Sequence, residues 1–263
     1  MIKIHPTAII EKGAEISDDV EIGAYSMISS SVTIDSGTKI LNHVTITGRT
    51  TIGKKNVVHP FSSLGGPPQD ITYRNEPTEL IIGNENIIRE NSTLNIGTVK
   101  GNAITSVGNK NIIMAYSHIA HDCKLENNIL MANGTQLGGH VLIENNATLG
   151  GFSLIHQFVA IGRGSFTSMG SAINKDLPPY CLASGNYARA IGLNKVGLRR
   201  SGMPSEVINA LSKAFRMLVQ RRQEPDEYVL GQLTSQYVEL DHFVKFIRNS
   251  KRGILRTHLK ARV

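Results

Sequence analysis

The chain has 263 residues, of which 40% are hydrophobic and 19% are charged, with a net charge of +7, as in an ordinary soluble protein. Its only cysteines, Cys123 and Cys181, form no CxxC pair, which argues against a disulfide framework and a cysteine-bound metal and favours a reducing, cytoplasmic compartment. The N-terminus has no apolar leader and no stretch approaches the roughly 18 apolar residues of a membrane span, so we expect no stable membrane insertion.

An aliphatic residue recurs at every sixth position. The run extends from Ile4 to Leu64, resumes from Ile82 to Leu94, and continues after a one-residue shift from Val107 to Ile161. Neither a helix nor a flat strand has this period. Three hexads make an 18-residue coil with three short sides, and its turns stack at a strand spacing of about 4.8 Å. The sequence therefore predicts a mainly β protein, with a parallel β-helix of hexapeptide repeats over residues 1–186.

Two segments interrupt the period and are expected to leave the coil as loops. They cover about residues 66–80 and about residues 96–106. Loops on a rigid scaffold commonly carry function, although tolerated surface insertions would interrupt the period equally well.

The pattern becomes helical after Pro178 and Pro179. Apolar residues recur at helical spacing from Pro204 to Val219 and again from Val238 to Ser250. We therefore expect a small α-helical C-terminal domain over residues 187–263, with its helices packed on each other and on the β-helix.

The expected C-terminal domain is strongly basic. It holds 15 Lys and Arg against 6 Asp and Glu, whereas residues 1–186 hold 13 against 15. Such a surface is typical of plain solvated helices or of a protein with an acidic partner. We expect no nucleic-acid partner, because the chain has no Trp, few aromatic residues and no recognisable binding module.

Four histidines gather within 39 residues of the regular coil, namely His118, His121, His140 and His156. Because a turn has 18 residues, His121, Gly139 and Gln157 are expected to form a column down one face. Imidazole takes up a proton near neutral pH, so the cluster indicates a histidine base. Asp122 is a candidate to orient His121, and the N–H of Gly139 is a candidate oxyanion donor unless Gly139 is only a corner glycine.

Two other interpretations stay open from the residues alone. Clustered histidines also bind zinc, as in hexapeptide-repeat carbonic anhydrases. The HxxH pair of His118 and His121 differs from the widely spaced histidines of those enzymes, so we expect no metal. The other interpretation is that the solenoid has a purely structural role. This role would not explain why the histidines form a column. No nucleophile elbow or phosphate-binding loop is present, and we expect no cofactor.

Several short motifs carry a family resemblance. They are IAHDC at 119–123, GGH at 138–140, HQF at 156–158, DLPPY at 176–180 and GLRRSG at 197–202. With these, the chain closely resembles the UDP-N-acetylglucosamine O-acyltransferases of lipid A synthesis over nearly its whole length. The resemblance implies a left-handed coil and a homotrimer with active sites between subunits. It also implies transfer of a (R)-3-hydroxyacyl group from acyl carrier protein, an acidic partner, to the glucosamine 3-hydroxyl of UDP-N-acetylglucosamine.

The resemblance also implies individual roles. His121 matches the general base, Gly139 the oxyanion donor and Asp70 the loop residue that holds the sugar. Asn194 and Arg200 match residues near the nucleotide and its phosphates. Further positions that contact the substrate or shape the cleft are Thr72, Asn95, His118, His140, His156 and Gln157.

Some positions depart from the best-known members of the family. Thr72 stands where a lysine is usual and Asn95 where a histidine is usual. Val196 replaces an acidic residue and Ser201 a basic one. A variant that acts on a 3-amino sugar therefore stays an alternative. The sister N-acyltransferase of the same pathway is another, although it usually carries an additional N-terminal domain and the hexads here begin at Ile4.

Met169 matches the position that limits the acyl chain, where long-chain enzymes have glycine. It lies about 2.7 turns from His121, or roughly 13 Å at the spacing of neighbouring strands. A methionine at this position predicts an acyl chain nearer ten carbons than fourteen. The alternative is that Met169 is ordinary filler.

Overall fold

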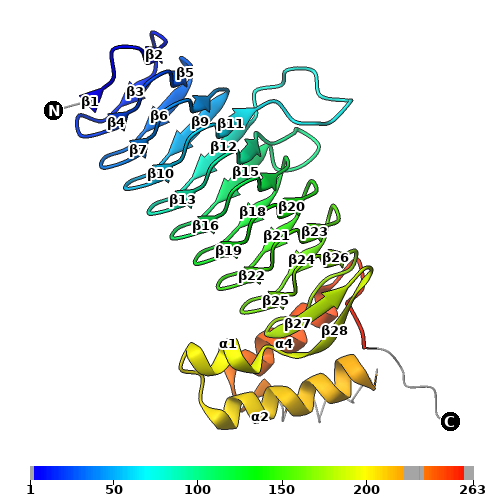
Figure 1. The fold of residues 1–263 in the computed structure, drawn as a ribbon. Coiled ribbons are helices and arrows are strands. Elements are labelled where there is room, and N and C mark those ends of the chain that lie inside the picture. Colours follow the sequence, from blue (N-terminus) through cyan, green and yellow to red (C-terminus); the bar gives the residue numbers. More distant parts are fainter. Residues whose placement is uncertain (1–2, 222–230, 232–233, 258–263) are drawn as a thin grey trace.

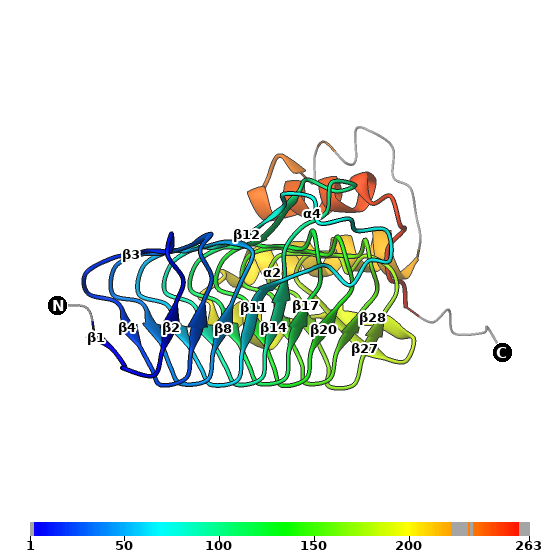
Figure 2. The ribbon, with the colours of Figure 1, turned by 90° about the horizontal axis from the view of Figure 1, so that it is seen from above.

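In a computed structural model that describes residues 3–221, 231 and 234–257, the chain forms a left-handed parallel β-helix followed by a β-hairpin and a group of helices (Figure 1). The short strands lie in three sheets, which form the three sides of the coil (Figure 2). Apart from the terminal β27–β28 hairpin, neighbouring strands in each sheet run parallel. The fold predicted from the hexads is therefore confirmed.

The first sheet contains β1 (Lys3–Ile4), β4 (Glu21–Ile22), β7 (Lys39–Ile40), β10 (Val57–Val58), β13 (Ile87–Ile88), β16 (Ile112–Ile113), β19 (Leu130–Met131), β22 (Thr148–Leu149), β25 (Phe166–Thr167), β27 (Cys181–Gly185) and β28 (Ala188–Leu193). The second contains β2 (Ile9–Ile10), β5 (Met27–Ile28), β8 (Thr45–Ile46), β11 (Ser63–Gly66), β14 (Thr93–Asn95), β17 (His118–Ile119), β20 (Gln136–Leu137), β23 (Leu154–Ile155) and β26 (Ala172–Ile173). The third contains β3 (Glu15–Ile16), β6 (Val32–Ile34), β9 (Arg49–Ile52), β12 (Glu79–Ile82), β15 (Ile104–Val107), β18 (Lys124–Leu125), β21 (Leu142–Ile143) and β24 (Ala160–Ile161).

Strand register confirms the 18-residue turn. His118 pairs with Gln136, which in turn pairs with Leu154. The sequence separation between paired residues of neighbouring strands exceeds 18 only across the two expected loops. These loops lie between β11 and β12 and between β14 and β15. Both loops end slightly earlier than expected, because residues 79–80 and 104–106 already pair as strands in β12 and β15.

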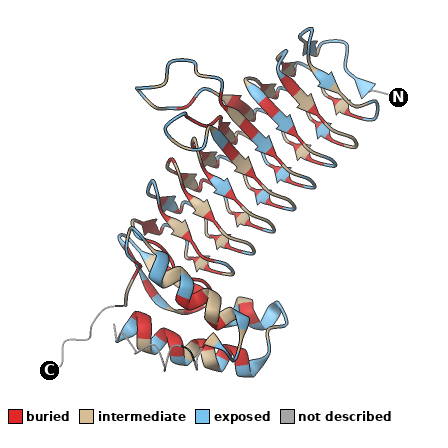
Figure 3. Cartoon of the chain, turned by 180° about the vertical axis from the view of Figure 1, so that it is seen from behind, coloured by how far each residue is buried: buried red, intermediate tan, exposed pale blue. Residues whose placement is uncertain are grey.

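The hexad residues form the core, as the period predicted. Those from Ile22 to Ile161 are buried, and the buried positions repeat along the strands in Figure 3. At the N-terminal end Ile4 is 38% exposed, while Ile10 and Ile16 are only partly buried. These residues form the first turn of the coil within the described part of the chain, so described turns cover them from one side only.

The C-terminal domain expected from residue 187 does not begin with a helix. The expected boundary after residue 186 falls in the turn of a hairpin, because residues 188–193 form β28, which pairs antiparallel with β27. The helices are α1 (Lys195–Arg200), α2 (Ser205–Ala214), the π-helix η1 (Phe215–Gln220) and α4 (Val238–Asn249). Helices α2 and α4 pack on each other, as expected. No helix among the described residues is long and apolar enough to cross a membrane.

The C-terminal segment returns to the last turn of the coil. The N–H of Asp176 donates to Gly253 O at 3.0 Å, and the N–H of Leu255 donates to Asp176 O at 2.8 Å. The Ser250 hydroxyl donates to the Asp176 carboxylate at 2.6 Å. Helix α4 is also tied to the coil by His242, whose Nε2 lies 2.8 Å from the Glu144 carboxylate. The expected packing of the helices on the β-helix is therefore confirmed.

Phe243 offers a test of this packing, because its side chain on α4 is completely buried. We expect Phe243→Ala to lower the free energy of unfolding by about 3–5 kcal/mol, through lost burial and the cavity left behind. Val238→Ala, at an exposed position of the same helix, is the matched control and should change it by less than about 1 kcal/mol. Urea denaturation followed by circular dichroism measures both, and equal effects would show that α4 is not packed as described.

Candidate active site

The predicted histidine column lies beside an open groove on the outer face of the second sheet. The groove has a volume of about 660 Å³ and runs along β17, β20, β23 and β26. Its lining includes His118, His121, Gly139, His156 and Gln157. Gln69 of the first loop also lines it, so this loop reaches the groove.

Backbone hydrogen bonds confirm the column. The N–H of His140 donates to His121 O at 3.0 Å, and the N–H of Phe158 donates to Gly139 O at 2.9 Å. These bonds join residues 19 apart, and together with the 18-residue strand register they place His121, Gly139 and Gln157 on successive turns. Gly139 is so close to His121 that a Cβ atom added to the glycine would lie 2.6 Å from the Cε1 atom of the ring.

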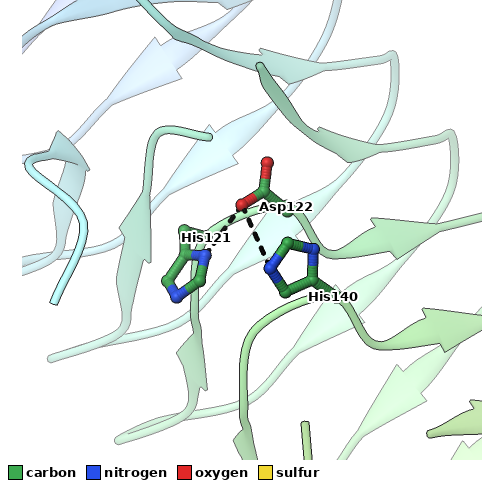
Figure 4. A group of neighbouring side chains, drawn as sticks. All are labelled: His121, Asp122 and His140. Carbon is green, nitrogen blue, oxygen red and sulfur yellow. Dashed lines mark hydrogen bonds and ion pairs between the residues drawn. The ribbon is translucent and has the colours of Figure 1, made fainter. Parts of the chain in front are cut away.

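His121 and Asp122 form a direct pair, shown in Figure 4. His121 Nδ1 lies 2.8 Å from Asp122 Oδ2. Adjacent residues of a strand point apart, but Asp122 occupies a corner of the coil with φ +61°, which turns its carboxylate back toward the ring. A carboxylate accepts only, so Nδ1 carries the hydrogen and Nε2 is left free to accept a proton.

Thr98 holds the Asp122 carboxylate. Its N–H donates to Oδ1 at 2.9 Å and its hydroxyl donates to Oδ2 at 2.7 Å. The N–H of Asp122 donates to the Thr105 hydroxyl at 2.8 Å. The second loop thus fixes the partner of the candidate base. Sequence reasoning missed Thr98, and the only signal was its place in a segment that interrupts the hexads.

The two flanking histidines differ in their surroundings. His140 stacks on Phe158, with ring centroids 4.4 Å apart, and its Nε2 lies 3.6 Å from Asp122 Oδ2. Burial is the main cause that lowers the pKa of His140. His118 Nδ1 lies 2.7 Å from the Thr93 hydroxyl, and burial followed by repulsion from His121 lowers its pKa. Both rings are thereby favoured in their neutral form.

Gly139 lines the groove beside His121. Its N–H donates to no acceptor among the residues that the structure describes. An N–H without a protein partner is available to accept an oxyanion as its hydrogen-bond partner, so the role of Gly139 as an oxyanion donor stays a prediction.

The first loop brings Asp70 and Thr72 together. The N–H and hydroxyl of Thr72 both donate to Asp70 Oδ1, at 2.8 and 2.7 Å, and these bonds lower the pKa of Asp70. Lys100 of the second loop donates to the Thr72 hydroxyl and lies 3.9 Å from Asp70 Oδ2. Lys100, which sequence reasoning missed, therefore supplies a cation beside Asp70 and Thr72.

Asn95 ends β14 next to the loops. Its Nδ2 donates to Gly66 O at 3.4 Å, while its buried Oδ1 has no hydrogen-bond partner within the described part of the chain. A buried acceptor without a partner costs free energy unless something satisfies it.

The remaining predicted residues lie elsewhere. Asn194 caps α1 and lines a second cavity of about 830 Å³ between the last turns of the coil and the helices. Arg200 is exposed at the end of α1. Met169 is 78% exposed in the turn between β25 and β26 and does not line the groove. A single chain therefore does not bring these three residues to the histidines.

His121, Asp122 and His140 also form a group of three possible metal ligands, whose atoms lie within 4.8 Å of one another. The Asp122 carboxylate already accepts both Thr98 donors, and His121 Nδ1 points directly at it. This geometry fits a hydrogen-bonded His–Asp pair better than a metal centre, which needs three ligands directed at one point.

Comparison with known proteins decides the family. A model described as Udp N-acetylglucosamine O-acyltransferase, domain 2, matches residues 176–255. A Thermodesulfovibrio yellowstonii protein named acyl-[acyl-carrier-protein]–UDP-N-acetylglucosamine O-acyltransferase is 45% identical over 258 residues, covering 97% of this chain and 100% of that protein. A Syntrophobacter fumaroxidans protein of the same name is 46% identical over 260 residues, with the same coverage. This chain belongs to the UDP-N-acetylglucosamine O-acyltransferase family.

Solved structures of the family agree. The UDP-N-acetylglucosamine acyltransferase from Campylobacter jejuni superposes with a TM-score of 0.90 at 40% identity, covering 97% of this chain and 100% of that one. The Francisella novicida enzyme gives a TM-score of 0.92 at 35% identity, covering 97% and 94%. The resemblance drawn from the motifs is confirmed, and the protein is an acyltransferase.

Proposed function

We propose that this member of the UDP-N-acetylglucosamine O-acyltransferase family transfers a (R)-3-hydroxyacyl group from acyl carrier protein to the 3-hydroxyl of UDP-N-acetylglucosamine, with His121 as general base. The observation that carries the proposal is the His121–Asp122 pair beside the free N–H of Gly139. A base with an available Nε2 and an oxyanion donor one turn away are what direct acyl transfer requires.

In this mechanism His121 Nε2 takes the proton of the sugar 3-hydroxyl as its oxygen attacks the thioester carbonyl. The N–H of Gly139 stabilises the negative oxygen of the tetrahedral intermediate. The carbon–sulfur bond then breaks, and His121 returns the proton to the thiolate of the carrier. Asp122 stabilises the imidazolium between the two steps. The reaction needs no cofactor and no metal.

The sugar nucleotide is proposed to bind between the two loops and the histidine column. Asp70, held by Thr72 and Lys100, supplies acceptors for sugar hydroxyls. Asn95 Oδ1 is a buried acceptor that a ligand donor can satisfy. A 3-amino sugar stays the second candidate acceptor, because Thr72 and Asn95 replace residues that are usual in relatives.

We further propose that the protein works in the cytoplasm as a homotrimer. Asn194, Arg200 and Met169 lie away from the histidines of their own chain, so a neighbouring copy would have to supply them to the groove. The basic residues of 187–263 are the proposed contact for the acidic carrier protein. Sedimentation velocity tests the trimer, and a monomer at working concentration would contradict it.

The proposed activity is tested by mixing the purified protein with 3-hydroxyacyl carrier protein and UDP-N-acetylglucosamine. We expect one product that carries a single acyl group, detected by mass spectrometry. No transfer to this nucleotide, together with transfer to its 3-amino analogue, would assign the second candidate. No transfer to either would contradict the proposal.

Met169 is the residue from which we predict the length of the acyl chain. It lies in an exposed turn, where a second copy of the coil would pack in the proposed trimer. A chain of ten carbons is shorter than one of fourteen by four methylenes, each worth roughly 0.8 kcal/mol of burial. We expect the wild type to prefer ten carbons and Met169→Gly to shift the ratio of the two products toward fourteen by tenfold or more. Competition between the two carrier-protein substrates measures this, with Tyr25→Ala, an exposed residue far along the coil, as the control. A wild-type preference for fourteen carbons would contradict the role of Met169.

A further inference from the structure

The C-terminal segment places an arginine against a histidine of the groove. Arg252 Nη2 lies 3.0 Å from His156 Nδ1, although the two residues are 96 positions apart. Arg252 Nε also donates to Asn174 O at 2.9 Å, which fixes the plane of the guanidinium. Asn174 and His156 both line the groove.

The backbone around Arg252 is built to hold it there. Hydrogen bonds from Asp176 to Gly253 and from Leu255 to Asp176 flank the arginine, and Ser250 bonds the Asp176 carboxylate. Gly253 has φ +74°, a conformation that glycine adopts without strain. The position of the guanidinium is therefore set by several contacts and not by one long side chain alone.

Two groups compete for His156 Nδ1. One is the Arg252 guanidinium, which is always charged and can only donate. The other is Gln157 O, 3.1 Å away, which can only accept. A single ring nitrogen cannot satisfy both. When Nδ1 accepts from Arg252, the hydrogen resides on Nε2, and the bond to Gln157 O is not made.

We propose that Arg252 is a positioning residue that holds His156 as the neutral tautomer with the hydrogen on Nε2. His156 is then fixed as a donor toward an acceptor oxygen of the bound substrate. This inference rests on the proposed function, in which His156 contacts the substrate. Without Arg252, Gln157 O captures Nδ1–H, and Nε2 becomes an acceptor with the wrong polarity for that contact.

The test combines a tautomer measurement with kinetics on the full-length protein. Nitrogen-15 histidine spectra report which ring nitrogen carries the hydrogen, and the His156 signals are assigned by their loss in His156→Gln. We expect Nε2–H in the wild type and Nδ1–H in Arg252→Met. We also expect kcat/KM to fall on the order of tenfold in Arg252→Met, as for loss of one hydrogen bond that involves a charge.

Two further variants separate positioning from charge or folding. Arg252→Lys keeps a cation that only donates, so it should retain the Nε2–H tautomer and most of the activity. Lys175→Met removes an exposed cation next to Asn174 and should change neither readout.

Nδ1–H in the wild type, or an unchanged tautomer in Arg252→Met, would overturn the proposal. A switched tautomer with wild-type kcat/KM would overturn it too. The spectra do not require turnover, so a failure of the proposed function would be seen separately, as a wild-type protein without acyl transfer.

Discussion

His121→Ala is expected to lower the rate of acyl transfer by about a hundredfold to ten-thousandfold, the range that a general base contributes. In the His121–Asp122 pair, the group that can take the hydroxyl proton is Nε2 of the imidazole. It is free because the hydrogen bond to Asp122 is made by the other ring nitrogen, Nδ1. The side chain lies in an open groove and not in the core, so the variant should fold normally. The measurement is kcat for acyl transfer to UDP-N-acetylglucosamine at saturating carrier protein.

His43→Ala is the matched control for this loss. His43 lies in a distant corner of the same coil, stacked between Tyr25 and Phe61. Its removal deletes the same chemical group from the same scaffold and should leave kcat within about twofold, because it contacts no part of the groove. Equal losses in both variants would mean that stability and not catalysis is being measured. Full activity in His121→Ala would remove His121 from the mechanism.

Gly139→Ala is the second variant with a large expected effect. The added Cβ would lie 2.6 Å from His121 Cε1 and 2.8 Å from Nε2, which is closer than a Cβ atom approaches an atom of a residue that is not its chain neighbour. The ring must therefore turn away from the position in which it meets the substrate hydroxyl, and the methyl group also crowds the oxyanion position. We expect kcat to fall on the order of a hundredfold to a thousandfold, comparable to loss of an oxyanion donor.

The control for this variant is Gly192→Ala, since a Cβ at Gly192 meets nothing within 4 Å. Both variants should melt within a few degrees of the wild type, because the nearest atoms to a Cβ at Gly139 belong to the His121 ring, which borders the groove, and a Cβ at Gly192 meets nothing within 4 Å. A crystal structure of Gly139→Ala should show the His121 ring rotated away from Asp122. Wild-type activity with an unmoved ring would show that Gly139 is only a corner glycine.

The periodic part of the fold could be predicted from sequence because its cause is local. Each hexad aliphatic from Ile22 to Ile161 is buried by the turns stacked on it, so one period fixes sheet, register and core. A second inward row two positions earlier escaped notice because it mixes apolar residues, such as Val44 and Val141, with polar ones, including Ser26 and Asn56. The polar ones are satisfied by backbone partners inside the coil, as when the Ser26 hydroxyl donates to Leu41 O at 2.7 Å.

The candidate site could be predicted only in part. The period placed His121, Gly139 and Gln157 in one column, but it could not show that Asp122 turns back on His121, because this depends on a left-handed corner residue. Thr98, Lys100 and Arg252 reach the site from two irregular segments, where no period relates sequence to position. The hairpin of β27 and β28 was missed because its strands follow the last regular hexads.

The central claim is that an ester forms at the 3-hydroxyl of the sugar nucleotide. The most direct test is the bond in the isolated product, read by the proton chemical shift at sugar carbon 3 and by treatment with mild alkali. An ester at this position predicts a downfield shift of that proton and release of the 3-hydroxy fatty acid by alkali. An alkali-stable amide, or an acyl group at any other position of the nucleotide, would contradict the account.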